Sequence, residues 1–416
     1  MRTLFFAAIV ALVALPARAQ EIESAWVQYA PGGAAEARAT VAGQTCRALA
    51  VDGVDTAMTV RAVGDAAFPT VCSAPIPAGA KAVTIGEHVL PVPAANPTRI
   101  LVMGDTGCRI KGRNVQSCND PRRWPFPDMA KEEAKLKPDL VIDVGDYLYR
   151  ENACPPGVSG CAGTPHGDNW PTWNADFFAP AAPLLAAAPW VVVRGNHEDC
   201  VRAGSGWLRL MGPLAFDPSA GCVTHLAPYS VPIGAVTLVV LDDADAPDTS
   251  VAADMVPVYR SEIAALADAP APSWLLMHRP IWGAIAGPFG IPVGGNRTLI
   301  AAIGSAGIPE PVELMLSGHI HSFEAINYAA KNRVPPQIVA GFGGDKLDRT
   351  PRVLPGTVFQ GSSDVSVRHG LSLPGFGFLM MRKSASGWDI DVHDVRGKIE
   401  RRCWFRAEHV GCASPR

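Results

Sequence analysis

Carboxylate, phenol, amide and imidazole side chains recur directly after short apolar runs of this sequence. They fall in five segments: Gly-Asp-Thr-Gly at 104–107, Gly-Asp-Tyr-Leu-Tyr at 145–149, Gly-Asn-His-Glu at 195–198, His278, and Gly-His-Ile-His at 318–321. These side chains supply the oxygen and nitrogen donors that bind metal ions. A lone Gly-Asp pair is more often a turn, and a lone histidine is more often structural, so the prediction depends on all five segments together. Their donors exceed what one ion needs, and the sequence therefore predicts two metal ions.

The apolar runs that precede these segments have the composition of strands buried on both faces. Such runs occur at 100–103, 140–142, 190–193, 237–241, 274–277 and 314–316. Helices are expected between them, at 129–136, 175–188, 261–267 and 298–303. This alternation predicts an α/β domain, in which polar side chains at the strand ends form the site. Glycine at 104, 145, 195 and 318 would let the turn tighten and point the next side chain into the crevice.

The two ends of the chain differ in pattern from this central part. Short alternating strands are expected at 25–29, 56–63 and 82–90, which predicts a small β-domain over 20–97 with the prolines at 91–93 as linker. Residues 377–406 alternate like antiparallel strands and are expected to close the sheet. The predicted organisation is a signal peptide at 1–19, a β-domain at 20–97, and the main domain at 98–416.

The order of the five segments resembles that of the calcineurin-like metallophosphoesterases, and within them the purple acid phosphatases. The resemblance covers roughly residues 98–344, over which the chain carries D-x-G, G-D-x-x-Y, G-N-H-E, a strand-end histidine and G-H-x-H in that order. It implies a layered α/β/β/α metallophosphoesterase domain preceded by a small all-β domain. It also implies hydrolysis of phosphate monoesters through a metal-activated hydroxide.

Carried over residue by residue, the resemblance implies two ligand sets that share one carboxylate. The first ion would be held by Asp105, Asp146, Tyr149 and His321, and the second by Asp146, Asn196, His278 and His319. The phenolate and carboxylates suit Fe(III), whereas the imidazoles and amide suit Zn, Mn or Fe(II). The broader superfamily usually has histidine at the position of Gly107, so Tyr149 marks the purple acid phosphatase-like subgroup. The alternative for Tyr149 is a core tyrosine beside the site.

Residues outside the ligand sets have predicted roles in catalysis and substrate binding. His197, one position after a ligand, is expected to stabilise the phosphoryl group or to protonate the leaving oxygen. Arg279, His166 and Trp170 are candidates for substrate binding, with surface or structural roles as the alternatives. Residues 283–318 contain no histidine and are apolar and rich in Gly and Pro at 287–295, which leaves a usual monoesterase proton donor in doubt. A phosphodiesterase acting on nucleotides or lipid head groups, and an inactive metal-binding recognition protein, are therefore alternative functions.

Cysteine content and the first residues of the chain predict export. A charged start, an apolar run at 4–15 and Ala-Arg-Ala at 17–19 have the layout of a cleaved signal peptide, and the run is short for a membrane anchor. The ten cysteines include no C-x-x-C pair, which favours disulfides in a secreted or periplasmic protein. Their spacing suggests Cys46–Cys72, Cys108–Cys118, Cys154–Cys161, Cys200–Cys222 and Cys403–Cys412, with other pairings or free thiols as the alternative. The net charge of −3 argues against a nucleic-acid partner. The family resemblance implies a small phosphate ester as the partner.

Overall fold

The computed structural model describes residues 21–362 and 364–414, so the expected signal peptide lies outside the described residues.

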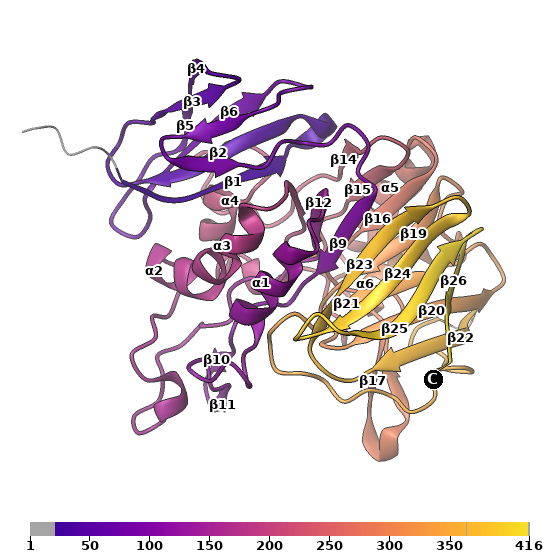
Figure 1. Ribbon diagram of the computed structural model, residues 1–416. Helices are drawn as coiled ribbons and strands as arrows, with labels where there is room; N and C mark the ends of the chain where they lie inside the picture. Colours follow the sequence, from indigo (N-terminus) through magenta and orange to yellow (C-terminus); the bar gives the residue numbers. More distant parts are fainter. Residues whose placement is uncertain (1–20, 363, 415–416) are drawn as a thin grey trace, which may run out of the picture.

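Two large mixed sheets organise this part of the chain (Figure 1). The first sheet has the strand order β26 (His409–Cys412), β25 (Ile399–Arg406), β24 (Gly387–Asp394), β23 (Gly377–Ser384), β9 (Arg99–Met103), β12 (Leu140–Asp143), β13 (Trp190–Val192), β1 (Ile22–Tyr29), β2 (Ala35–Val41), β6 (Thr70–Ile76) and β5 (Thr59–Ala62). The second has the order β14 (Tyr229–Pro232), β15 (Thr237–Val240), β16 (Ser273–Leu276), β19 (Val312–Ser317), β21 (Gln337–Ala340), β20 (Phe323–Ala330) and β22 (Val365–Leu373).

Three smaller sheets and six α-helices complete the described fold. The small sheets are β4 (Val54–Ala57) with β3 (Ala48–Val51), β7 (Val83–Ile85) and β8 (His88–Leu90); the hairpin β10 (Ile110–Lys111) with β11 (Asn114–Val115); and the hairpin β17 (Ala284–Ala286) with β18 (Pro292–Gly294). The helices are α1 (Phe126–Lys135), α2 (Trp170–Trp173), α3 (Ala179–Leu185), α4 (Gly204–Leu210), α5 (Val256–Ala265) and α6 (Arg297–Ile303). A π-helical turn at Asn174–Phe178 joins α2 to α3.

Three hydrophobic clusters show how the layers stack. The central cluster joins the inner faces of the two large sheets, for example Ile100 and Ile142 of the first with Leu276 and Leu316 of the second. A second cluster lies between the outer face of the first sheet and α1–α4, and a third between the second sheet and α5 and α6. Burial of these apolar faces drives the stacking. The predicted α/β/β/α layering is therefore confirmed.

The N-terminal region is all-β, as expected, and it connects directly to the main domain. Its strand β1 pairs in parallel with β13, with Gln28 opposite Trp190. Of the indigo strands at the top of Figure 1, β1, β2, β5 and β6 thus extend the first sheet, whereas β3 and β4 belong to the separate four-stranded sheet with β7 and β8. A domain boundary at residue 97 stays a prediction.

All six apolar runs form strands, and the four expected helices overlap α1, α3, α5 and α6. The yellow C-terminal strands β23–β25 close the first sheet beside β9 (Figure 1). The sequence did not predict β2, β20, β21, β22 or α4.

The ten cysteines form five disulfides with the pairing that the spacing suggested. Such a set is compatible with a secreted or periplasmic protein. None of the helices in the described ranges has the length and apolar character that a membrane span requires.

A buried carboxyl on α1 makes the stability of the fold depend on pH. Glu133 is fully buried, and neither of its carboxyl oxygens has a hydrogen-bond partner among the described residues. Burial raises its pKa from 4.5 to about 8. The unfolded chain therefore releases this proton first as the pH rises, and the folded state loses stability between about pH 4.5 and pH 8.

Glu133→Gln should remove this loss, because the amide stays uncharged. Urea unfolding at pH 4.5 and pH 8.5 should show that the wild-type protein loses roughly 2–5 kcal/mol more than the variant over this interval. Parallel pH profiles for the two proteins would contradict the burial of an ionisable Glu133.

Candidate metal centre

All seven predicted metal donors meet where the two large sheets face each other. Asp105, Asp146 and Asn196 follow β9, β12 and β13 of the first sheet, while His278 and His319 follow β16 and β19 of the second. Tyr149 and His321 lie three and two residues beyond Asp146 and His319. Because these five strands are parallel within their sheets, their carboxyl ends deliver side chains to one edge of each sheet.

The phenol oxygen of Tyr149 lies at the centre of the first group of donors. It is 2.8 Å from Oδ1 of Asp105, 2.7 Å from Oδ2 of Asp146 and 3.1 Å from Nε2 of His321. All four side chains are at least nine-tenths buried. Four donor atoms thus face one another away from solvent, as a compact metal site requires.

The second group adjoins the first and contains two imidazoles and an amide. Donor atoms of Asp146, His278 and His319 all lie within 4.8 Å of one another. One end of the Asn196 amide is 3.2 Å from Nε2 of His278 and 2.6 Å from Nδ1 of His319, and this end carries the oxygen. Hydrogen bonding alone would favour the amide turned around, whereas a cation would favour the oxygen in this place. The donor set therefore fits a metal ion.

One carboxylate oxygen belongs to both groups. Oδ2 of Asp146 lies 2.7 Å from the Tyr149 phenol oxygen and 3.2 Å from Nε2 of His278. The other oxygen, Oδ1, accepts the backbone N–H of His197 at 2.8 Å. This arrangement orients Asp146 so that a single oxygen faces both sets of donors.

Each of the three histidines is fixed by a bond at its second ring nitrogen. Nδ1 of His278 lies 2.8 Å from the carbonyl oxygen of Val144, and Nδ1 of His321 lies 2.8 Å from that of Lys346. Nε2 of His319 lies 2.8 Å from Oδ2 of Asp248. Bonds of this kind select the tautomer and orient the ring, so the remaining nitrogen presents its lone pair to the cluster.

The backbone at the strand ends has a strained conformation that orients the donor side chains toward the cluster. Asp105, Asp146 and His319 have φ values of 57°, 63° and 67°, in the left-handed region. Such conformations cost roughly 1–3 kcal/mol each and persist only where the surroundings enforce them. The Glu198 carboxylate helps to do so, since it accepts the backbone N–H groups of Asp146 at 3.2 Å, Tyr147 at 2.9 Å and Leu148 at 3.1 Å.

Gly107 makes room for the Tyr149 ring. A Cβ atom at this position would lie 2.8 Å from Cδ2 of Tyr149 and 2.6 Å from the carbonyl oxygen of Tyr147. Asp176 fixes the same turn, because its carboxylate accepts the backbone N–H groups of Cys108 at 2.9 Å and Tyr149 at 2.8 Å. A larger residue at 107 would therefore displace the phenol from the cluster.

The electrostatics of the cluster favour bound positive charge. Burial acts to lower the pKa of His278, but Asp146 outweighs it and raises that pKa to about 9. Burial also acts to lower the pKa of His321, while Asp345 and Asp105 raise it to about 10. The phenol of Tyr149 behaves oppositely, since burial and then Asp105 and Asp146 raise its pKa well above the ordinary value. A phenolate here would need a strongly Lewis-acidic cation beside it.

His197 lies beside the cluster and faces a carboxylate outside it. Its Nδ1 is 2.8 Å from Oε1 of Glu151, while its Nε2 stays 3.9 Å from Oδ2 of Asp146. The imidazole ring packs on Tyr149 with ring centroids 3.9 Å apart. Burial acts to raise the pKa of Glu151, but His197 and then Lys111 lower it to about 2, so Glu151 stays a carboxylate that can support a protonated imidazole.

Comparison with known proteins identifies the family to which this arrangement belongs. The family model of the calcineurin-like phosphoesterases matches residues 98–323, which is more than half of the chain. The chain belongs to the calcineurin-like phosphoesterases. This membership supports a phosphoric ester hydrolase and confirms the family resemblance seen in the sequence.

Two solved structures share the fold of this phosphoesterase. The purple acid phosphatase PPD1 from seeds of yellow lupin (Lupinus luteus) has a TM-score of 0.54 and 13% identity, with 91% of this chain and 73% of that chain covered. PhoD also has a TM-score of 0.54 and 13% identity, with 94% of this chain and 92% of that chain covered. At this identity the similarity establishes the fold alone. No curated protein sequence matches the chain.

The three candidates for substrate binding lie in different surroundings. Arg279 is near the phosphoesterase cluster, but its guanidinium group pairs with Asp248, the carboxylate that also bonds to Nε2 of His319, which suits it to orienting that carboxylate. His166 is exposed in the loop before α2. Trp170 is buried and packs on Phe178 with ring centroids 5.1 Å apart, within the cluster behind the first sheet. The structure therefore does not bring Trp170 to the site, contrary to expectation, because an indole is more stable in this apolar layer.

Several residues that support the site were missed by the sequence analysis. Glu151 pairs with His197, Asp248 with His319, and Asp345 with His321 and Arg109. The only available signal was position: Glu151 follows Tyr149 by two residues, and Asp345 follows a Gly-Gly pair after β21. Asp248 lies in an irregular loop, and nothing in its local sequence distinguishes it.

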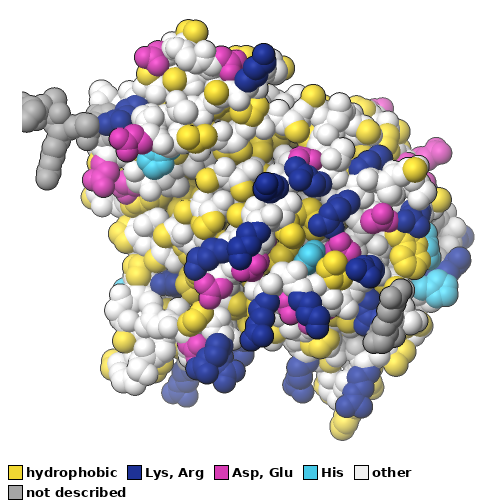
Figure 2. Space-filling model, in the orientation of Figure 1, with side chains coloured by type: hydrophobic (Ala, Val, Ile, Leu, Met, Phe, Trp, Pro, Cys, Tyr) yellow, Lys and Arg dark blue, Asp and Glu magenta, His cyan; other side chains and the backbone are white. Residues whose placement is uncertain are grey.

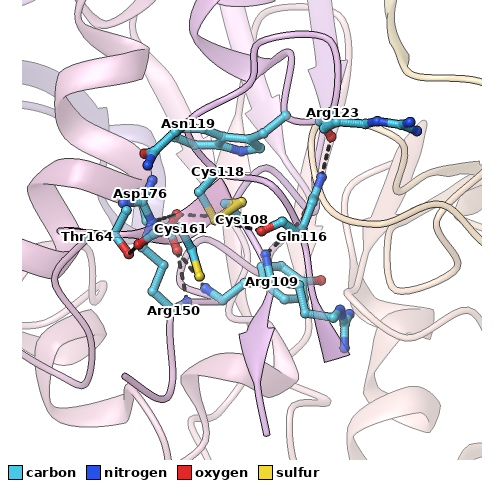
Figure 3. The surroundings of a disulfide bond; sticks show 12 residues. Cys108, Arg109, Gln116, Cys118, Asn119, Arg123, Arg150, Cys161, Thr164 and Asp176 are labelled. Atoms are coloured by element: carbon cyan, nitrogen blue, oxygen red, sulfur yellow. Dashed lines mark hydrogen bonds and ion pairs between the residues drawn. A yellow bond between two sulfur atoms is a disulfide. The ribbon is translucent and has the colours of Figure 1, made fainter. Parts of the chain in front are cut away.

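The Cys108–Cys118 disulfide ties down the loop that leaves Asp105 (Figure 3). Next to it, the Gln116 side chain accepts the Arg109 backbone N–H at 3.1 Å and donates to the carbonyl oxygen of Arg123. The Arg109 guanidinium lies 4.9 Å from the centre of the Tyr149 ring. The disulfide thus holds a loop that packs on the Tyr149 ring. The cross-link lowers the conformational entropy that this loop loses when the chain folds.

Proposed function

We propose that this chain is a dinuclear metal-dependent phosphatase that hydrolyses phosphate monoesters, as a purple acid phosphatase-like member of its family. The observation that supports this most strongly is the position of Asp146 Oδ2, which faces Tyr149 on one side and His278 on the other. Such an oxygen suits a bridging ligand between two cations. The proposed ligands are Asp105, Asp146, Tyr149 and His321 for one ion, and Asp146, Asn196, His278 and His319 for the other.

Two ions held there would supply Lewis-acid activation of a water molecule and neutralise charge on the phosphoryl group. The chain itself supplies orientation and a proton. His197, held by Glu151 through Nδ1, presents Nε2 toward the cluster and would donate its proton to the leaving oxygen. Glu198 and Asp176 hold the backbone of the donor residues in place, because their carboxylates accept the backbone N–H groups of Asp146 and Tyr149.

The proposed metals are Fe(III) at the Tyr149 site and Zn, Mn or Fe(II) at the other. Iron-loaded protein should be coloured, because a ferric phenolate absorbs visible light by charge transfer. Tyr149→Phe should abolish the visible band and leave the second metal site in place, since no donor of that group bonds to the phenol except the shared Asp146. A colourless wild-type protein that contains stoichiometric ferric iron would refute the role of Tyr149.

Hydrolysis of p-nitrophenyl phosphate and of its bis-ester by one metal-reconstituted preparation tests the function. We expect turnover of the monoester, a faster rate than with the bis-ester, and loss of both rates with a chelator. Preference for the bis-ester would refute the monoesterase proposal and favour a phosphodiesterase. Stoichiometric metal without hydrolysis of either compound would favour a metal-binding recognition protein.

The proposed setting of this reaction is outside the cytoplasm, after cleavage near Ala19. Five disulfides support this setting because they persist in oxidising compartments. N-terminal sequencing of the exported protein would test the cleavage position.

A further inference from the structure

A cleft of about 340 Å³ adjoins the metal centre on the side of His319. Its apolar walls come from Pro280, Ile285, Val293 and Ile320. Its polar lining comes from His319, Asp248, Thr249, Asp348 and Gln360. Ile285 and Val293 face each other across the β17–β18 hairpin, in register. Volumes of this size accommodate a small organic group.

His319 connects the cleft with the cluster. One ring nitrogen of His319 faces the Asn196 amide within the proposed second metal site, and the other bonds to Asp248 in the cleft. A phosphate ester whose phosphoryl group lies at the cluster would thus extend its organic part along the apolar walls.

The carboxylates of the cleft have partners within the protein. Asp248 already accepts from Nε2 of His319, from Arg279 and from Nδ2 of Asn296. Asp348 accepts the backbone N–H of His321 at 3.0 Å. Asp248 is thus already paired with Arg279 and His319, and an alkyl or aryl group would bury apolar wall without losing any of these hydrogen bonds.

The apolar surface continues from the cleft to the end of the hairpin. Val293 is 43% exposed, Ile291 is 60% exposed and Phe289 is completely exposed at the tip. The hairpin projects at the lower edge of the molecule in Figure 1, and its tip shows hydrophobic atoms in Figure 2. Exposed apolar side chains next to a binding site are typical of surfaces that bind apolar ligands.

The base of the hairpin is firmly held, so its walls form a defined boundary of the cleft. The backbone N–H of Ala284 donates to Glu324, and that of Ala286 donates to the carbonyl oxygen of Arg349 at 2.7 Å. On the other strand, the N–H of Gly295 donates to the carbonyl oxygen of Gly283 at 3.0 Å.

We propose that the cleft between His319 and the β17–β18 hairpin binds the organic part of the substrate, and that this part is an uncharged alkyl or aryl group. The physiological ester is thus amphiphilic, with its phosphate at the metal centre and its apolar part against Ile285 and Val293. This inference depends on the proposed function, because it places the phosphate at the cluster.

Calorimetric binding of two non-hydrolysable phosphonates to metal-reconstituted protein tests the proposal without relying on turnover. Ethylphosphonate and hexylphosphonate carry the same head group and differ by four methylenes. We expect hexylphosphonate to bind roughly 10- to 100-fold more tightly, with a more negative heat-capacity change. The double variant Ile285→Ser with Val293→Ser should bring this ratio close to one and leave ethylphosphonate binding unchanged.

A matched control replaces Val54 and Val89, two exposed valines of the N-terminal region, by serine. This control should keep the wild-type ratio. Equal affinity of the two phosphonates for the wild-type protein, or an unchanged ratio in the cleft variant, would overturn the cleft assignment alone. Absence of binding of both phosphonates would overturn the phosphate site and the cleft proposal with it.

Discussion

Replacing Asp146 by asparagine should lower kcat/KM for p-nitrophenyl phosphate by at least about 10³-fold, the largest loss expected from a single conservative change. The carboxylate is fully buried and its Oδ2 faces both donor groups. An amide removes a negative charge from the middle of the cluster. Its one oxygen can serve either the two donor groups or the backbone N–H of His197, but not both. Both proposed ions would therefore be held less tightly.

Asn196→Asp is the matched comparison, because it makes the reverse exchange at a residue that faces only the second group. It should cost about 10- to 100-fold, since the new carboxylate still supplies an oxygen. Both variants must be compared at measured metal content. Losses of the same size at equal metal occupancy would contradict the shared role of Asp146.

Replacing His197 by alanine should lower kcat by about 10²–10⁴-fold while the metal content stays unchanged. The side chain bonds to Glu151 and keeps Nε2 at 3.9 Å from Asp146, so it is close enough to reach a substrate without belonging to either donor group. The loss should shrink for esters of acidic phenols, whose leaving oxygen needs little protonation. Loss of metal in this variant would show that His197 is a ligand and refute the assignment.

Glu151→Gln separates orientation of His197 from its chemistry. Glutamine keeps the size of the side chain but removes the charge that supports a protonated imidazole. We expect a loss of about tenfold, and a smaller loss for esters of acidic phenols. A variant as active as the wild-type protein on poor leaving groups would indicate that Glu151 only fills space beside Lys111.

The convergence of the seven proposed donors could be predicted from sequence because their positions depend on local features. A buried strand, a glycine and a polar residue recur, and parallel strands bring their carboxyl ends to one edge. Asp105, Asp146 and His319 indeed lie at such ends in the left-handed conformation. The spacing of Asp146 and Tyr149 could likewise be recognised without knowledge of the distant chain.

The supporting residues could not be predicted, because long-range packing alone brings them to the site. Asp248 reaches His319 across 71 positions and Asp345 reaches Arg109 across 236. Strand β2 was missed because its Ala, Glu and Arg residues also favour helices, and pairing with β1 and β6 determines its conformation. Trp170 was a candidate for substrate binding, whereas its large apolar surface packs in the core behind the first sheet.

The number of metal ions per chain tests the central claim most directly. Elemental analysis of reconstituted protein should give two ions per chain, and His278→Ala and His321→Ala should each lower the number to one, because each histidine belongs to a different donor group. One ion or none in the wild-type protein after reconstitution would contradict the dinuclear centre, even if phosphate esters were hydrolysed.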